Sequence, residues 1–264
     1  MTTATVERIV YEVDHAGATG GAVLCIHGLG GTSNTWTALL PALAREQVIR
    51  LDLPGSGRSA RVEGELSIDR FVKACLRVLA ACRVERVRVL AHSMGTIVAT
   101  HLAAAEPARV ASLALFGPLL APADAARPPL QARATKVRAE GVAGLQAVTD
   151  ALLPLALASQ THAGRHAAVA YVRETLMRQD PDGYARSTDA LAAAVPADPE
   201  RIGCPTLLVT GDQDNVAPPS AVRQMADRIR GARVEVLAGC GHWTPIERPD
   251  ACIDALRRFH ERRA

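Results

Sequence analysis

Ser93 stands between small residues where an apolar run meets a helical stretch, in the pentapeptide AHSMG at 91–95. In a strand–turn–helix pattern of this kind, a sharp turn exposes the serine hydroxyl as a nucleophile. The amide of Met94 then lies at a helix N-terminus, where it can stabilise developing negative charge. A serine is also a common N-cap, so the pentapeptide alone leaves a purely structural role open.

A serine hydroxyl is a weak nucleophile until a base takes its proton, and that base is commonly a histidine oriented by a carboxylate. His242 lies in the glycine-flanked segment AGCGHW at 238–243, after an apolar run, and is the predicted base. Asp214, the second carboxylate of the turn GDQD at 211–214, is the predicted acid, and Asp212 is the alternative. Both aspartates have a structural alternative, which is to stiffen this turn or cap the helix beyond it.

A second glycine-rich turn, HGLGG at 27–31, follows an early apolar run. Its glycines allow a backbone amide to point into a pocket, and the amide of Leu29 is the predicted partner of the Met94 amide in an oxyanion hole. A glycine-rich turn after a strand can also bind phosphate. Neither GxGxxG nor GxxxxGK[ST] occurs in this turn, so the sequence favours acyl transfer over nucleotide binding.

These segments are embedded in an alternation of strands and helices. Apolar runs predict strands at 22–26, 48–53, 87–90, 110–116, 205–210 and 233–237, with a further strand at 6–13. Helices are predicted at 36–44, 67–81, 96–105, 220–230 and 250–262, and Ser67 is the predicted N-cap of the second. The alternation predicts an α/β fold with a doubly wound, mostly parallel sheet.

Residues 119–199 depart from this rhythm. No convincing strand occurs among them, and breaks near Gly141, Pro154, Gly164 and the PDG sequence at 181–183 predict about four helices. We therefore predict one core domain, made of residues 1–118 and 200–264. A helical cap, residues 119–199, is inserted into that core.

Composition excludes several classes of partner. The 264 residues carry a net charge of +3, from 30 basic and 27 acidic side chains, so no nucleic-acid or membrane partner is expected. The six cysteines form no CxxC pair, and the N-terminus lacks a signal-peptide pattern, which together predict reduced thiols and a cytoplasmic location. The oligomeric state stays open, and a homo-oligomer is among the states compatible with the sequence.

Taken together, the motifs resemble the α/β-hydrolase fold superfamily, in particular its capped soluble serine esterases and lactonases, such as 3-oxoadipate enol-lactonases. The likeness rests on HGLG at 27–30, DLPGSGRS at 52–59, the Ser93 turn, GDQD at 211–214, GH at 241–242 and IERP at 246–249. It implies an eight-stranded sheet, no cofactor, no metal and a small-molecule substrate. The implied reaction is cleavage of a small carboxylic ester or lactone by Ser93, His242 and Asp214 through an acyl-enzyme intermediate.

Four further residues are expected at the substrate pocket, namely Gly28, His92, Trp243 and Asn34. Trp243 adjoins the predicted base, although a packing role fits it equally well. The segment CGHW at 240–243 and Asn34 resemble residues of enzymes that hydrolyse carbon–carbon bonds of vinylogous diketones. Hydrolysis of such a carbon–carbon bond is therefore the alternative reaction. A non-catalytic binder of small molecules on the same fold is a further alternative, because function resides in the site and not in the fold.

Overall fold

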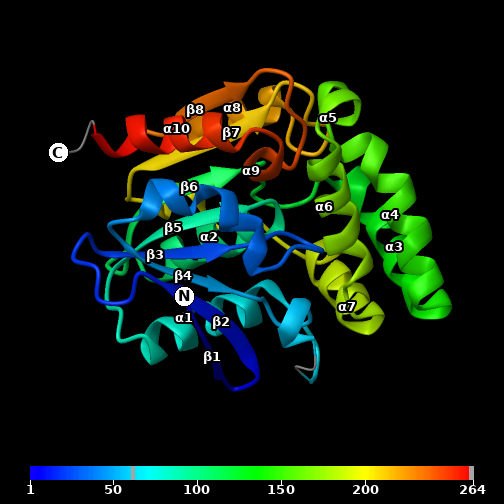
Figure 1. Cartoon of the computed structure of the whole chain (residues 1–264), viewed down its shortest axis with the longest axis horizontal. Coiled ribbons are helices and arrows are strands. Elements are labelled where there is room, and N and C mark those ends of the chain that lie inside the picture. The colour runs from blue at the N-terminus through cyan, green and yellow to red at the C-terminus, as the bar shows by residue number, and fades with distance from the viewer. Residues whose placement is uncertain (61–62, 262–264) are drawn as a thin grey trace.

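The computed structural model describes residues 1–60 and 63–261 (Figure 1). These residues form an eight-stranded sheet with the order β1-β2-β4-β3-β5-β6-β7-β8. The strands from β4 to β8 in this order run parallel, whereas β1 and β2 are antiparallel to their neighbours. The predicted fold class is therefore confirmed. The strands are β1 (Thr2–Val6), β2 (Ile9–Asp14), β3 (Ala22–Ile26), β4 (Gln47–Leu51), β5 (Val87–His92), β6 (Val110–Phe116), β7 (Thr206–Gly211) and β8 (Arg233–Leu237).

Helices bury both faces of the sheet. The helices α1 (Ile68–Ala81), α2 (Met94–Ala105) and α8 (Pro219–Arg228) cover one face with aliphatic side chains. The 3₁₀-helical segment η1 (Ser33–Leu43) and α10 (Pro249–Glu261) cover the other. Coverage of both faces explains why the central strands are continuous apolar runs rather than alternating patterns. Short helical turns complete the core, namely η2 (Gly57–Ser59), η4 (Pro199–Arg201) and α9 (Thr244–Glu247).

Two of the predicted elements differ from the structure. The single strand expected at 6–13 is wrong, because Glu7 and Arg8 adopt positive φ angles of 46° and 66° and turn the chain between β1 and β2. Such a turn usually contains glycine or asparagine, so this sequence carried no signal for it. The helix expected at 36–44 is the 3₁₀-helical η1. Ser67 does cap α1 by accepting a hydrogen bond from the amide of Arg70.

Between β6 and β7 the chain forms the turn η3 (Asp124–Ala126) and five α-helices, one more than predicted. We call α3 to α7 the inserted helices. Pro154 lies two residues before the end of α4, and Pro181 is the first residue of α7, so both of these predicted breaks fall close to a helix boundary. The inserted helices are α3 (Arg127–Glu140), α4 (Val142–Ala156), α5 (Ser159–Gly164), α6 (His166–Met177) and α7 (Pro181–Ala192).

The inserted helices lie together beyond one end of the sheet, at the right of Figure 1. Parallel strands β3, β5, β6 and β7 all end on this side, so the turns that follow them face the inserted helices. The predicted closing helix, α10, is described as far as Glu261, and Arg262 lies outside the described residues. Of the helices described, none is long and apolar enough to span a lipid bilayer.

Candidate active site

Ser93 occupies a strained turn between β5 and α2. Its φ of 52° and ψ of −123° lie outside the regions that residues with a side chain usually adopt, at a cost of about 1–3 kcal/mol. Gly95 permits this turn, because a Cβ there would lie 2.5 Å from the carbonyl oxygens of Ile26 and His27. A Cβ on Gly28 would likewise lie 2.7 Å from that of Ser93, so the turn after β3 passes directly beside the serine.

His242 links the serine to a buried carboxylate. Its Nε2 lies 2.8 Å from Ser93 Oγ, and its Nδ1 lies 2.9 Å from Asp214 Oδ2. Asp214 follows β7, and its Oδ1 accepts hydrogen bonds of 2.8 Å from the amides of Val216 and Ala217. The structure thus brings together the three residues that the sequence singled out as nucleophile, base and acid.

The surroundings of Asp214 keep its carboxylate ionised. Burial alone would raise the pKa of Asp214, but His242 and the amides of Ala217 and Val216 outweigh burial and lower it to about 2. An ionised Asp214 holds the imidazole proton on Nδ1, which leaves the Nε2 lone pair directed at Ser93 Oγ. Asp212, the alternative acid, instead accepts a hydrogen bond from the amide of Cys240 and so stabilises the histidine turn.

The two predicted oxyanion amides belong to elements that meet at Ser93. Met94 is the first residue of α2, so its amide has no carbonyl partner within the helix. Leu29 follows Gly28 and lines the same pocket as Ser93. His27 anchors this turn, because Nδ1 donates to the Gly28 carbonyl at 2.8 Å and Nε2 accepts from the Leu53 amide at 2.9 Å. Burial lowers the pKa of His27, so its ring is held neutral in this role.

His92 and Trp243 both line the pocket, as the sequence predicted. His92 Nε2 donates to the carbonyl of His242 at 2.9 Å, and its ring centroid lies 5.1 Å from those of His242 and Trp243. Burial lowers the pKa of His92 to about 3, and its ring is therefore neutral. Gly28 adjoins Ser93 without lining the cavity, and Asn34 is exposed in η1 and does not reach it. The structure therefore does not support Asn34 as a pocket residue.

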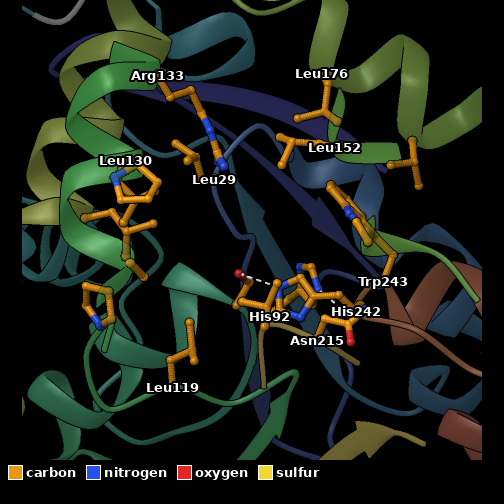
Figure 2. Close-up of a pocket in the computed structure, with 18 of the residues that line it drawn as sticks. Leu29, His92, Leu119, Leu130, Arg133, Leu152, Leu176, Asn215, His242 and Trp243 are labelled. Carbon is orange, nitrogen blue, oxygen red and sulfur yellow. Dashed lines mark hydrogen bonds between the residues drawn. The ribbon is translucent and has the colours of Figure 1, made fainter. Parts of the chain in front are cut away.

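The pocket is a cavity of about 420 Å³ between Ser93 and the inserted helices. Its walls are mostly aliphatic, with Leu130, Leu152 and Leu176 from α3, α4 and α6 among them (Figure 2). Arg133 and Asn215 add polar groups to this wall. Within residues 1–60 and 63–261, no cluster of three or more His, Cys, Asp or Glu side chains is arranged to hold a metal ion.

Glu247 is a residue of this site to which the sequence alone assigned no role. Its side chain is fully buried, and its Oε1 accepts hydrogen bonds of 3.1 Å from the amides of Gly241 and Trp243, on either side of His242. Its Oε2 accepts from the amide of Ala158, at 2.8 Å, and from Thr161 Oγ1, at 2.7 Å. The IERP segment contained this residue, but no local pattern indicated which donors it would meet.

Gly117 and Gln179 were also missed. Gly117 follows β6 with a φ of 55°, and a Cβ there would lie 2.9 Å from Cε1 and Nδ1 of the His242 ring. Gln179, between α6 and α7, donates from Nε2 to the Gly30 carbonyl at 3.1 Å and accepts from the Gly57 amide at 3.1 Å. A glycine directly after a parallel strand was the available signal for Gly117, whereas the contact of Gln179 spans almost 150 residues.

The chain matches the family model described as alpha/beta hydrolase fold over residues 21–249. It is 32% identical over 242 residues to the putative carbamate hydrolase RutD of Variovorax paradoxus (strain S110), covering 88% of each chain. It is 28% identical over 246 residues to the 2-hydroxymuconate semialdehyde hydrolase of Pseudomonas sp. (strain CF600), covering 88% of this chain and 84% of that protein. The solved enol-lactonase from Burkholderia xenovorans LB400 superposes with a TM-score of 0.89 at 26% identity, covering 98% of this chain and all of the other. The protein therefore belongs to the alpha/beta hydrolase fold family and is a hydrolase of that family.

Proposed function

We propose that this hydrolase cleaves small carboxylic esters or lactones through an acyl-enzyme intermediate on Ser93. The observation that carries the proposal is the hydrogen-bonded series from Ser93 through His242 to the buried Asp214, which opens onto an apolar pocket. Fold alone would not support it, because this fold hosts many functions.

In the first half of the proposed reaction, His242 Nε2 takes the hydroxyl proton while Ser93 Oγ forms a bond to the substrate carbonyl carbon. The carbonyl oxygen becomes an oxyanion, which the amides of Leu29 and Met94 stabilise, each contributing about 3 kcal/mol. The protonated His242 then donates its proton to the leaving oxygen as the carbon–oxygen bond breaks. An ester releases an alcohol at this stage, whereas the hydroxyl of an opened lactone remains part of the acyl group.

In the second half, water attacks the Ser93 ester while His242 takes its proton. Collapse of the second tetrahedral intermediate breaks the bond to Ser93 Oγ, which regains its proton from His242. The route uses only protein groups and water. In this proposal residues 119–199 are a cap that excludes bulk water and shapes the pocket, while residues 1–118 and 200–264 supply the chemistry.

Hydrolysis of a carbon–carbon bond in a vinylogous diketone is a second candidate. It is supported by the likeness to 2-hydroxymuconate semialdehyde hydrolase and by the position of Trp243 directly after the base. Enol-lactones and ring-fission diketones, assayed side by side, distinguish the two reactions, since only one class is expected to be turned over efficiently.

Intact-mass measurement after treatment with a fluorophosphonate tests the activated serine, with p-nitrophenyl esters assayed in parallel. A single adduct and ester turnover are expected for the native chain and for the control Ser220→Ala, which alters an exposed serine. Ser93→Ala is expected to fold, to form no adduct and to lose about 10³-fold or more of turnover. Absence of an adduct on the native chain would contradict the proposal. Ligand-induced shifts in melting temperature that survive in Ser93→Ala would then favour a non-catalytic binder.

A further inference from the structure

The exposed residues among those that line the cavity mark its mouth. Most of the lining residues are buried or half-buried. The exposed ones fall into two groups, which are Ala123, Ala126 and Pro129 near the start of α3 and Asn215 and Val216 directly after Asp214. The mouth of the cavity therefore lies between residues 123–129 and the turn that carries Asp214.

A second hollow begins at this mouth. It is a surface groove of about 650 Å³ between residues 154–163, at the α4–α5 junction, and residues 213–215, and we call it the outer groove. Asn215 lines both the cavity and the outer groove, whereas His162 and Ala163 of α5 line the groove and not the cavity. A ligand that fills the cavity and extends past Asn215 would therefore enter the outer groove.

Hydrogen bonds hold the two walls of the outer groove together. Asn215 Nδ2 donates to the Leu155 carbonyl at 3.2 Å. Gln213 Oε1 accepts from the Ser159 amide at 3.1 Å and from Ser159 Oγ at 3.2 Å. The outer groove is thus a formed feature of the fold and not a gap between independent segments.

The outer groove offers acceptors to a polar ligand. His162 Nε2 donates to the Leu153 carbonyl at 3.1 Å, which leaves Nδ1 of the neutral ring as an acceptor. The Asn215 side chain donates through Nδ2, so its Oδ1 is the acceptor. Such acceptors suit the hydroxyl groups of a ligand, in contrast to the mostly aliphatic walls of the cavity.

The chemistry places the alcohol part of an ester on the side of the outer groove. The leaving oxygen takes its proton from His242 Nε2, so the alcohol part lies next to His242. His242 binds Asp214, and Asn215 follows Asp214 along the chain. Figure 2 shows Asn215 beside His242, with Leu130 across the cavity. The acyl part is thereby directed into the cavity and the alcohol part towards the mouth.

We propose that the outer groove binds the alcohol part of the substrate, and that this hydrolase prefers esters of hydroxyl-rich alcohols that extend beyond the cavity, such as an acylated sugar. The inference rests on the proposed function, because it names the substrate class of the same site. The alcohol is released from the outer groove while the acyl group stays on Ser93 in the cavity. Residues of the outer groove bind the substrate remote from the reacting atoms.

The test compares butyrate esters of three alcohols. They are the primary hydroxyl of methyl glucoside, methoxyethanol, whose leaving oxygen has a similar reactivity, and octanol, which is long but apolar. Release of butyrate gives kcat/KM for the native chain, Ala163→Trp and the control Ala167→Trp. Ala163→Trp fills part of the outer groove, whereas Ala167 is an exposed residue of α6 that lines neither the groove nor the cavity.

The native chain is expected to favour the glucoside ester over the other two by about tenfold or more, because binding of a remote part of the substrate can lower the barrier. Ala163→Trp is expected to remove this preference while changing kcat/KM for the methoxyethyl ester less than about threefold. Ala167→Trp should leave the preference unchanged. Equal rates of the native chain on the glucoside and methoxyethyl esters would overturn the proposal, as would a preference for the octyl ester or a preference for the glucoside that survives in Ala163→Trp.

A binding measurement keeps this inference separate from the proposed function. If no ester is hydrolysed and no fluorophosphonate adduct forms, the proposed function fails. Calorimetric titration of the glucoside butyrate into Ser93→Ala, with and without Ala163→Trp, then tests the outer groove alone. About tenfold weaker binding in the double variant would support the groove as a binding site, and equal affinities would reject it.

Discussion

The Glu247 carboxylate lies 2.8 Å from the amide of Ala158 and so ties the turn that carries His242 to the junction between α4 and α5. The same side chain accepts hydrogen bonds from the amides on both sides of His242. The backbone amide of His242 itself donates to the Ala156 carbonyl at 2.8 Å. The position of the proposed base is therefore set by the inserted helices as well as by the sheet.

Glu247→Gln is expected to lower both stability and chemistry. A glutamine can accept on one side only, so amide donors near the new NH₂ group lose their acceptor, which costs about 2–4 kcal/mol of unfolding free energy. The rate of fluorophosphonate labelling per folded molecule should fall about tenfold, because a small displacement of the proposed base lowers the reaction rate steeply. Labelling is measured at a temperature where the variant is fully folded.

The control for this change is Glu140→Gln, which alters an exposed carboxylate. It should leave labelling unchanged. If Glu247→Gln lost stability but labelled at the native rate once folded, Glu247 would be a structural residue without influence on His242.

Asp214→Asn tests whether activity depends on the orientation of the proposed base as well as on its presence. The asparagine oxygen can keep the bonds to Val216 and Ala217, but its NH₂ group then faces His242 Nδ1 and favours the wrong tautomer. We expect kcat/KM to fall about 10³- to 10⁴-fold with the fold retained. Asp212→Asn is the matched change in the same turn, and it should cost less than about threefold. The reverse order of effects would reassign the acid to Asp212.

His92 makes the fold sensitive to acid. Its pKa is about 3 in the folded protein and about 6.5 when unfolded, so the unfolded chain binds a proton first as the pH falls. Stability attributable to neutral His92 is present above pH 6.5 and is lost as the pH falls towards 3. His92→Gln, which can still donate to the His242 carbonyl, should therefore lose about 3 kcal/mol less than the native chain between pH 7 and pH 4.5. Urea unfolding at the two pH values measures this, and equal losses would show that His92 does not titrate there.

Gly117→Ala tests the space beside the base. The added methyl group would lie 2.9 Å from the His242 ring at a φ of 55°, so either the ring or β6 must shift. We expect turnover to fall about 10²-fold, with a smaller loss of melting temperature. Gly203→Ala is the control, since a Cβ there meets nothing within 4 Å. Unchanged turnover in Gly117→Ala would mean that His242 tolerates displacement.

Features that depend on neighbouring residues could be predicted from the sequence. Buried parallel strands are apolar runs, and β6 and β8 begin and end where predicted. The turn at Ser93 requires small residues at fixed positions, and glycines flank His242 for a related reason, so both turns were recognisable. The first hairpin was not, because Glu7 and Arg8 are atypical of the turn that they form.

Features that depend on distant contacts could not be predicted. Asn34 lies only a few residues beyond the Leu29 turn, yet η1 directs it to the surface. Arg133 and Tyr184 lie 51 positions apart and face one cavity only because α3 and α7 pack together. No local pattern marks a buried carboxylate such as Glu247 or an amide such as Gln179 as an anchor between distant segments.

Hydrogen bonds join the inserted helices to the core beside both parts of the proposed catalytic site. Glu247 binds the α4–α5 junction next to His242, the proposed base, and Gln179 binds the turn that carries Leu29 from its place between α6 and α7. Replacing these helices with those of a relative would therefore change the reactivity of the site as well as its substrate selectivity. Laboratory evolution of a new substrate range should accordingly be easiest on α3, which lines the pocket but supplies no residue to either of these contacts.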